Sequence, residues 1–306
     1  MLHLRSLEEL SPEKTWLTIG VFDGVHRGHQ EIINHLRAGA KEAKASALVI
    51  SFSPHPAVVL GKRKDLKYLT LPDEKAELIE GLGVDILMTH PFNQRIAALS
   101  AEEFMAEIQA RVKLEKFLIG YDFALGKDRQ GDAEYLTALG QKAGYKVQTF
   151  GPVVTGDEAV SSSRIRAALA EGRVRDAIKY LGRPYALSGS VVHGDGRGRK
   201  INIPTANIES SPQKAVPLNG VYACWAYLHG KKHRAVTNIG IRPTFTPDKE
   251  QANIETHLLD FKDEIYGEEL KLEFISRLRD EKKFASVDEL LVQIRADIAK
   301  ANELLK

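Results

Sequence analysis

Short apolar runs alternate with amphipathic segments in the part of the chain before Leu181. Buried strands are expected where the apolar runs fall, at residues 17–22, 47–52, 85–88 and 117–120. Helical segments lie between them: Pro72 opens one that extends to Gly83, and Ser100 with Glu103 forms a capping box ahead of the next. This alternation predicts a doubly wound α/β domain with a parallel sheet. Ligands of such sheets bind at the carboxyl ends of the strands, where the strand order reverses.

A different pattern follows Leu181-Gly182-Arg183-Pro184. Strand-like runs succeed one another at residues 187–192, 221–228, 235–239, 254–259 and 270–278. No helical period separates them, which predicts a small antiparallel β-barrel. Ser286 and Glu289 form a capping box before a terminal helix, whose apolar stripe falls at residues 290, 291, 294 and 298. We therefore expect two domains, residues 1–183 and residues 184–306.

Composition narrows the class of protein. A chain of 306 residues with 43% hydrophobic and 27% charged residues favours two globular domains. The net charge of +2 gives no reason to expect nucleic acid or a membrane as a partner, so we expect small-molecule substrates. The single cysteine, Cys224, excludes an internal disulfide and favours a reducing compartment. With neither a signal-peptide pattern nor an apolar stretch of ~20 residues, the expected location is cytoplasmic.

The first chemical motif follows the first predicted strand and leads into a helix. Its residues 20–29 read Gly-Val-Phe-Asp-Gly-Val-His-Arg-Gly-His. His26 and His29 lie on one helix face, the helix N-terminus offers free amides, and Gly28 allows close approach of a phosphate. These features suit a triphosphate held for direct in-line transfer, since the motif contains no covalent nucleophile. Alone, a His-x-x-His pair often has no function or is half of a metal site, and no cysteine lies nearby in the sequence to complete a zinc set.

This motif resembles the H-x-G-H motif of the nucleotidyltransferase superfamily, in the form typical of bacterial FAD synthetases. Residues 51–56, 120–126 and 161–166 resemble later segments of that family, in the same order. The resemblance implies a Rossmann-like domain in which His26 and His29 contact ATP phosphates. It also implies further nucleotide-binding residues: Gly20, Phe22, Asp23, Gly28, Asp122, Ser161, Ser162, Ser163, Arg164 and Arg166. The segment from Ser161 could otherwise be an ordinary serine-capped helix with exposed arginines.

A second set of motifs lies in the predicted barrel. The glycine-rich basic loop at residues 193–200 is neither a dinucleotide fingerprint nor a Walker loop, but its amides could cover phosphates. A flexible hairpin loop is the alternative. Thr205 and Asn207 point to one side of an extended chain, and their oxygens suit Mg²⁺. Glu255 and His257 also share a face, where a carboxylate could take a proton from an alcohol or could simply meet water.

These motifs together resemble the riboflavin kinase family from Tyr185 onward. The matching segments are residues 196–207, 220–223, 238–245 and 255–261. The resemblance implies that Thr205 and Asn207 bind Mg²⁺ and ATP phosphates, and that Glu255 is the base for the ribityl 5′-hydroxyl. The loop residues expected to contact nucleotide are Gly194, Gly196, Gly198 and Arg199. Three positions depart from the usual family residues, namely Val21, Ser163 and Asn202.

As a whole the chain resembles bifunctional riboflavin kinase/FAD synthetases. That family phosphorylates riboflavin to FMN and then adenylates FMN to FAD, with ATP as co-substrate of both steps and Mg²⁺ as the expected metal. Two alternatives remain open. One is a riboflavin kinase with an inactive N-terminal domain. The other is a flavin-binding regulator without turnover, although the sequence shows no helix-turn-helix or basic patch.

Overall fold

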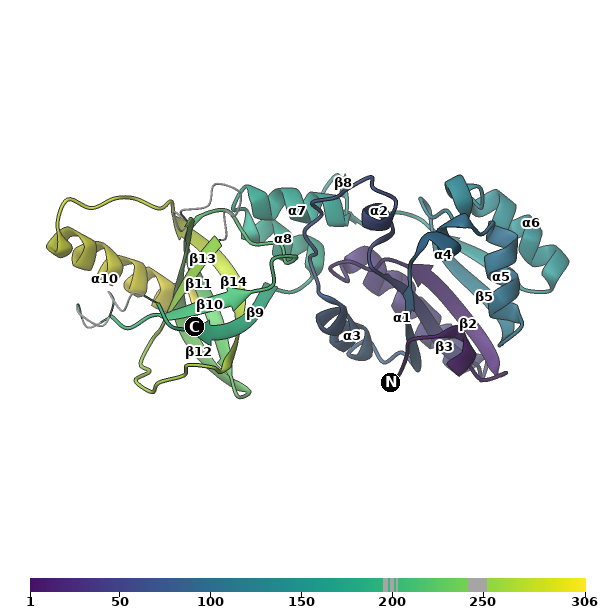
Figure 1. Cartoon of the computed structure of the whole chain (residues 1–306), viewed down its shortest axis with the longest axis horizontal. Coiled ribbons are helices and arrows are strands. Elements are labelled where there is room, and N and C mark those ends of the chain that lie inside the picture. The colour runs from purple at the N-terminus through teal and green to yellow at the C-terminus, as the bar shows by residue number, and fades with distance from the viewer. Residues whose placement is uncertain (195–197, 199–200, 202, 242–251) are drawn as a thin grey trace. The chain divides into compact units, whose positions relative to one another are not determined.

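The computed structural model describes residues 1–194, 198, 201, 203–241 and 252–306. It contains two compact units, Met1–Ser162 and Ser163–Lys306. Figure 1 shows the elements of each unit along the chain. The first unit is an α/β sheet domain and the second holds a β-barrel.

A six-stranded parallel sheet forms the first unit, in the order β1-β4-β3-β2-β5-β6. The strands are β1 (Leu2–Leu4), β2 (Lys14–Gly20), β3 (Ser46–Ser53), β4 (Ile86–Pro91), β5 (Lys113–Gly120) and β6 (Lys146–Phe150). The chain builds outward from β2 through β3 to β4, then crosses to β5 on the other side of β2. The strand order therefore reverses between β2 and β5, as a doubly wound sheet requires. The predicted fold of this part is confirmed.

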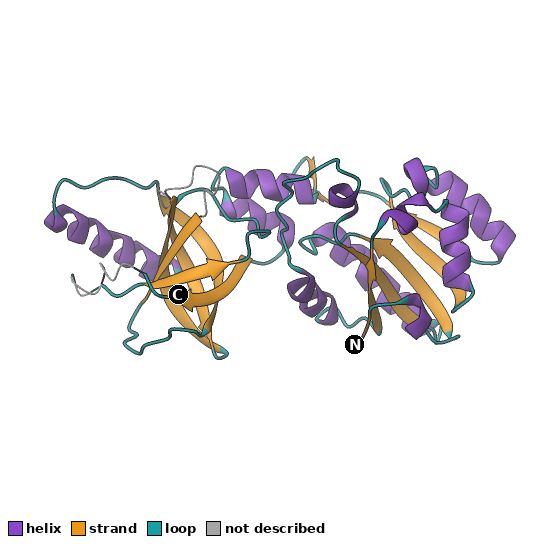
Figure 2. Ribbon diagram, viewed as in Figure 1, coloured by secondary structure: helices purple, strands orange, loops and turns teal. Residues whose placement is uncertain are grey.

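Helices cover both faces of this sheet (Figure 2). They are α1 (Arg27–Glu42), α2 (Pro56–Val59), α3 (Pro72–Glu80), α4 (Gln94–Ala98), α5 (Ala101–Gln109) and α6 (Ala133–Ala143), with 3-10 turns η1 (Leu7–Glu9) and η2 (Lys127–Arg129). The predicted starts at Pro72 and at the Ser100 capping box are confirmed. A small hairpin, β7 (Val154–Thr155) and β8 (Glu158–Ala159), follows the sheet.

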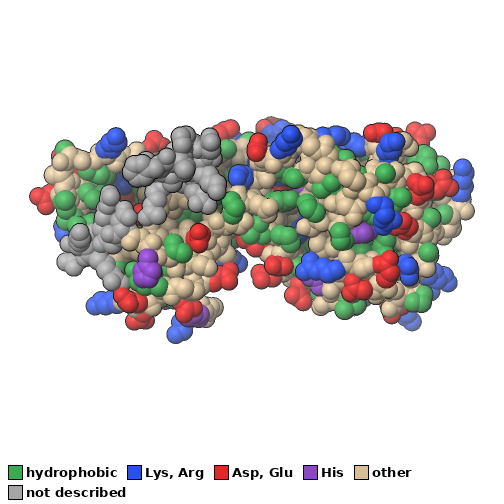
Figure 3. All heavy atoms as spheres, in the orientation of Figure 1, with side chains coloured by type: hydrophobic (Ala, Val, Ile, Leu, Met, Phe, Trp, Pro, Cys, Tyr) green, Lys and Arg blue, Asp and Glu red, His purple; other side chains and the backbone are tan. Residues whose placement is uncertain are grey.

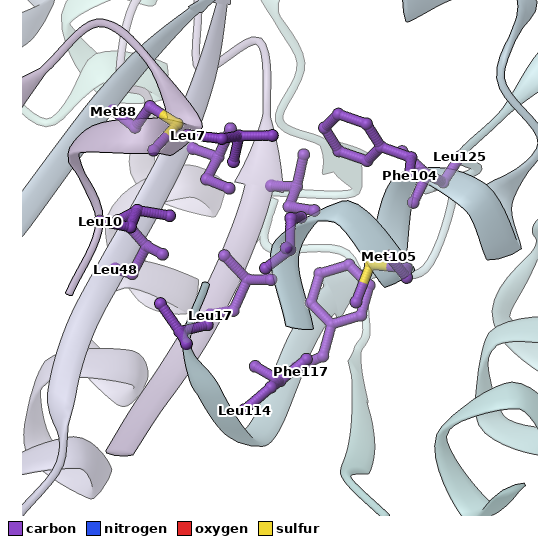
Figure 4. Close-up of a cluster of buried hydrophobic side chains, with 14 of the residues drawn as sticks. Leu7, Leu10, Leu17, Leu48, Met88, Phe104, Met105, Leu114, Phe117 and Leu125 are labelled. Atoms are coloured by element: carbon purple, nitrogen blue, oxygen red, sulfur yellow. The ribbon is translucent and has the colours of Figure 1, made fainter. Parts of the chain in front are cut away.

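Two hydrophobic cores stabilise the sheet, one on each face. Leu48 and Ile50 of β3 belong to one core, while Ala47 and Val49, which alternate with them, belong to the other. This period of two is the ordinary alternation of a strand, and residues 47–50 are all apolar because both faces are buried. Figure 4 shows part of the first core, in which Phe104 and Met105 of α5 pack near Leu17 and Phe117 of the sheet.

The second unit contains a closed antiparallel barrel, as predicted, in the order β10-β13-β12-β11-β14-β9. Its strands are β9 (Tyr185–Val192), β10 (Ala206–Ser210), β11 (Gly220–Leu228), β12 (Lys231–Ile241), β13 (Ala252–Leu258) and β14 (Glu269–Arg279). The terminal helix is α10 (Val287–Leu304), and the Ser286 side chain caps its N-terminus. Its last turns pack on the outside of β11, β12 and β14.

Two further helices, α7 (Ser162–Ala170) and α8 (Val174–Leu181), precede the barrel. Helix α8 packs on β14 and β9, and the Leu218 amide donates to the Leu169 carbonyl at the end of α7. These contacts place the boundary between the structural units after Ser162. The sequence alone could not show this, because α7 and α8 continue the alternating pattern of the first unit.

Candidate functional site

The histidine loop occupies residues 21–26, between the end of β2 and the start of α1. His26 is the N-cap of α1, and its Nδ1 accepts a hydrogen bond from the His29 amide at 3.4 Å. The two imidazole rings stack with their centroids 3.6 Å apart. The two predicted catalytic histidines therefore lie together at a helix N-terminus, a position that favours bound anions.

Glycines at both ends of this loop make room for its side chains. A Cβ on Gly20 would lie 2.9 Å from the ring of Phe22. A Cβ on Gly28 would lie 3.2 Å from Cε1 of His26. A Cβ at position 20 would force Phe22 to move, and one at position 28 would press on His26, so glycine lets both side chains pack against the backbone.

Asp23 is 3% exposed and anchors the loop. Its carboxylate accepts hydrogen bonds from the amides of Leu69 at 2.9 Å and Thr70 at 3.0 Å. Its carbonyl oxygen accepts one from the Ser162 hydroxyl at 2.9 Å. These contacts show that Asp23 holds the loop in place. Its contact with the nucleotide stays a prediction.

The end of β5 brings Asp122 to the same edge of the sheet. A Cβ on Gly120 would lie 3.5 Å from Oδ1 of Asp122 and 3.7 Å from Cδ1 of Ile32 on α1. Asp122 is exposed, and its backbone carbonyl oxygen accepts a hydrogen bond from Nη2 of Arg129 at 2.8 Å. Asp122 and the histidine loop thus follow the two neighbouring strands at which the sheet order reverses.

The remaining predicted residues of this site lie in and before α7. Ser161 and Ser162 end the first unit, whereas Ser163, Arg164 and Arg166 begin the second. The Ser162 hydroxyl reaches the carbonyl of Asp23 within the first unit. Contact of Arg164 and Arg166 with ATP stays a prediction.

In the barrel, strand register assembles the second site. Asn207 of β10 pairs with Glu255 of β13, which pairs with Asn238 of β12. Their strand neighbours Ile208, Ile254 and Thr256 are buried inside the barrel. Asn207, Glu255 and Asn238 therefore form one row on its outer face.

Polar contacts orient the members of this row. Nδ2 of Asn253 donates to Oε1 of Glu255 at 2.7 Å, and Nδ2 of Asn238 donates to Oε1 of Glu281 at 3.1 Å. His257 donates through Nδ1 to the carbonyl of Pro204 at 2.7 Å, and so holds the segment that carries Thr205. Sequence analysis missed Asn253, Asn238 and Glu281. The period of two along β13 was the signal that could have suggested Asn253.

Two described glycines of the 193–200 segment lie near the predicted metal ligands. A Cβ on Gly194 would lie 2.1 Å from Nδ2 of Asn207, and a Cβ on Gly198 would lie 3.4 Å from Oγ1 of Thr205. Glycine is therefore needed at position 194 for the approach to Asn207, while a Cβ on Gly198 would lie 2.2 Å from the carbonyl oxygen of Ile203. Gly196 and Arg199 lie outside the described residues. Oδ1 of Asn207 is buried and has no hydrogen-bond partner among the residues that the structure describes.

A cavity of about 380 Å³ opens beside Thr205. Its lining includes Val191 near the end of β9, Thr205 just before β10 and Leu258 at the end of β13. Phe261 and Tyr266, from the segment after β13, complete this set. The ring of His193 stacks on Tyr266 with a centroid distance of 3.9 Å. The mixture of apolar walls, an aromatic ring and nearby polar groups is typical of a small-molecule site.

Burial shifts the pKa values of two further groups, Lys75 and Cys224, in opposite directions. It lowers the pKa of Lys75 to about 8, against the opposing effect of the Asp23 carboxylate. It raises the pKa of the Cys224 thiol to about 12, despite a hydrogen bond with Thr237. Cys224 is therefore a packing residue inside the barrel, while Lys75 lies next to the histidine loop.

Each unit matches a known enzyme family. The family model described as FAD synthetase matches residues 8–164, and the model described as riboflavin kinase matches residues 181–305. In the part of the chain that the structure describes, no helix has the length and apolar character needed to cross a bilayer.

Relatives of the whole chain carry both activities in their names. The bifunctional riboflavin kinase/FMN adenylyltransferase of Bacillus subtilis is 38% identical, over 96% of this chain and 94% of its own length. The protein of the same name from Escherichia coli K12 is 36% identical, over 98% and 96%. A crystal structure from Streptococcus pneumoniae, titled a macrolide-efflux protein, is similar with a TM-score of 0.90 and 32% identity, covering 98% of both chains. The chain belongs to the bifunctional riboflavin kinase/FMN adenylyltransferase family.

Proposed function

We propose that the chain makes FAD in two ATP-dependent steps, one on the barrel and one on the parallel sheet. Its family makes it an enzyme of FAD biosynthesis that acts by way of FMN. One observation carries the assignment of the steps: each unit has its own assembled site, the stacked histidines on α1 and the Asn207–Glu255 row on the barrel.

In the first step, Glu255 acts as general base. Its carboxylate takes the proton of the riboflavin 5′-hydroxyl as that oxygen attacks the γ-phosphorus of ATP, and ADP leaves. The hydrogen bond from Asn253 to Oε1 supports this role, because it fixes the carboxylate and leaves Oε2 to face the alcohol. Glu255 is half-buried on the outer face of the barrel, which leaves the base partly accessible to a substrate.

We assign Mg²⁺ to Thr205 and Asn207. Both offer uncharged oxygens of the kind that Mg²⁺ accepts alongside phosphate oxygens and water. The fit is supported by Oδ1 of Asn207, which is buried and unpartnered among the described residues. When bound, the metal would neutralise charge on the ATP phosphates.

The cavity beside Thr205 suits the nucleoside part of this ATP. Tyr266 offers a ring for stacking, and Val191 and Leu258 offer apolar walls. For the flavin we propose the first turns of α10, where Val287 is 56% exposed and Val292 is 67% exposed. This segment follows Glu281, which binds Asn238 next to Glu255.

In the second step, a phosphate oxygen of FMN attacks the α-phosphorus of a second ATP, and pyrophosphate leaves. His26, His29 and the first amides of α1 stabilise the negative charge that develops on the phosphates. Gly20, Gly28 and Phe22 shape the loop for close approach. Asp122 and the segment from Ser161 to Arg166 complete this site in the proposal.

We place the division of the activities near Arg183, with residues 1–183 making FAD and residues 184–306 making FMN. The barrel begins at Tyr185. The match to the FAD synthetase model ends at residue 164, and the match to the riboflavin kinase model begins at residue 181. On the face shown in Figure 3, basic side chains are interspersed with acidic ones. This mixed charge on one face fits small-molecule substrates. We also propose that nucleic acid is not a partner and that the enzyme is cytoplasmic, with access to ATP.

Chromatography of the products from riboflavin, ATP and Mg²⁺ tests the proposal. We expect FMN first and FAD later from the wild-type chain. FMN without FAD would indicate a kinase with an inactive first unit. Binding of riboflavin without any product would indicate a regulator.

A further inference from the structure

Lys75 is buried beside the histidine loop. It lies on α3, is 5% exposed, and donates through Nζ to the carbonyl oxygen of Val21 at 3.0 Å. Burial lowers its pKa to about 8. An ammonium is expensive to remove from water, and an apolar side chain of similar length would fill the same space. Packing alone therefore does not account for a lysine here.

The loop that Lys75 contacts has an unfavourable backbone. Phe22, Gly24 and Val25 have φ values of 50°, 83° and 39°. Positive φ is strongly disfavoured for a β-branched residue such as Val25. Such a conformation persists only where surrounding groups impose it, and this occurs most often at functional sites.

One segment, residues 69–75, holds this loop from one side. The amides of Leu69 and Thr70 bind the Asp23 carboxylate, and Oγ1 of Thr70 accepts from the Gly24 amide at 2.9 Å. Lys75 adds the contact to Val21. Support therefore reaches the residues at which the chain turns from β2 toward His26.

Ser51 of β3 donates to the same Val21 carbonyl at 3.2 Å. The carbonyl is thus held by a neutral donor and a cationic one. Charge-assisted hydrogen bonds are the stronger kind, so the ammonium makes the firmer of the two contacts.

We propose that Lys75 is a positioning residue for adenylyl transfer. By holding the Val21 carbonyl it keeps the loop in the shape that presents His26 and the first amides of α1 to ATP. The inference rests on the proposed function. Lys75 acts through the loop, so its removal should lower kcat for FAD formation more than it raises KM for ATP.

Lys75→Met tests this, with Lys142→Met on the exposed side of α6 as the matched control. From FMN and ATP, the Lys75 variant should form FAD with a kcat lowered about 10-fold or more, and the control should match wild type. Lys75→Arg should recover part of the rate because it keeps a cationic donor. FMN formation from riboflavin in the same samples should be unchanged, and thermal unfolding should show that the first unit is folded.

A folded Lys75→Met protein with the wild-type kcat would overturn the inference. A wild-type chain that forms no FAD would instead contradict the proposed function, so the two failures are distinct. If Lys75→Met does not fold, Lys75→Gln takes its place, since it removes the cationic donor and keeps a polar side chain at this position. A lower kcat for FAD formation is then expected, and an unchanged kcat overturns the inference.

Discussion

The two sites of this chain hold their reactive groups by different means. On the parallel sheet, the loop before His26 has positive φ angles and depends on contacts from β3 and from residues 69–75. On the barrel, Asn207 and Glu255 lie opposite each other because β10 and β13 pair in a fixed register. Backbone hydrogen bonds of the ladder therefore place the kinase groups, whereas side chains place the histidines.

This difference predicts unequal tolerance to substitution. Side chains on β3 and in residues 69–75 hold the loop before His26 in its conformation. Substitution of Lys75, Ser51 or Thr70 should therefore slow FAD formation. The barrel site should respond mainly to changes in the groups that contact substrate and in their direct hydrogen-bond partners, because register survives most single substitutions. The predictions below test this contrast.

The largest effect is expected for Glu255→Gln. Loss of the general base should lower the rate of FMN formation by about 10²–10⁴-fold while FAD formation from supplied FMN continues. Steady-state assays of both reactions check this, with Glu209→Gln on the exposed side of β10 as the matched control. A kinase rate within a few-fold of wild type would show that Glu255 is not the base.

His29→Ala should give the reciprocal result. Removing one group that stabilises charge on the phosphates should lower the rate of FAD formation by about 10²-fold, with FMN formation unchanged. His35→Ala, at an exposed position on the same helix, is the control. If both reactions fell together, the assignment of one step to each unit would be wrong.

Asn253→Ala sharpens the comparison within the barrel. The lost hydrogen bond to the Glu255 carboxylate corresponds to about 1.5 kcal/mol, or roughly a tenfold lower kcat for FMN formation. KM for riboflavin should change little, because Asn253 orients the base rather than the substrate. Equal kcat values for the variant and wild type would assign this contact no part in the reaction.

The smallest effect concerns stability and pH. His90 on β4 is 7% exposed, neither ring nitrogen has a hydrogen-bond partner among the described residues, and burial lowers its pKa. The unfolded chain therefore binds a proton below about pH 6.5 that the folded chain does not, so the first unit loses stability as the pH falls.

Urea unfolding between pH 7.5 and pH 5.5 checks this expectation. His90→Phe should show a shallower acid loss than wild type, and His35→Phe should follow wild type. FAD formation should also fail at a higher pH than FMN formation. An identical acid slope in His90→Phe would remove His90 from the explanation.

The sequence predicted the architecture because both units use strong local patterns. The central parallel strands are buried on both faces and so appear as continuous apolar runs, whereas β1 has three residues and β6 is partly exposed, and both were missed. The barrel strands were predicted from strand-like runs with no helical period between them, except the short β10.

The sites divide in the same way. Alternation placed Asn207 on one face with Thr205 and Glu255 on one face with His257, and the resemblance to riboflavin kinases supplied their expected roles. Lys75 resembles an ordinary surface lysine of an amphipathic helix, and its contact with Val21 spans 54 positions. Only tertiary packing brings these two residues together, so no local pattern could predict the contact.

The most direct test of the two-site account mixes two full-length variants. With riboflavin, ATP and Mg²⁺, Glu255→Gln alone should form neither FMN nor FAD, and His29→Ala alone should accumulate FMN. Together they should form FAD, because FMN released by the intact barrel of one protein reaches the intact sheet domain of the other. If each variant behaves as expected alone but the mixture yields no FAD, the claim that two independent sites act in sequence is contradicted.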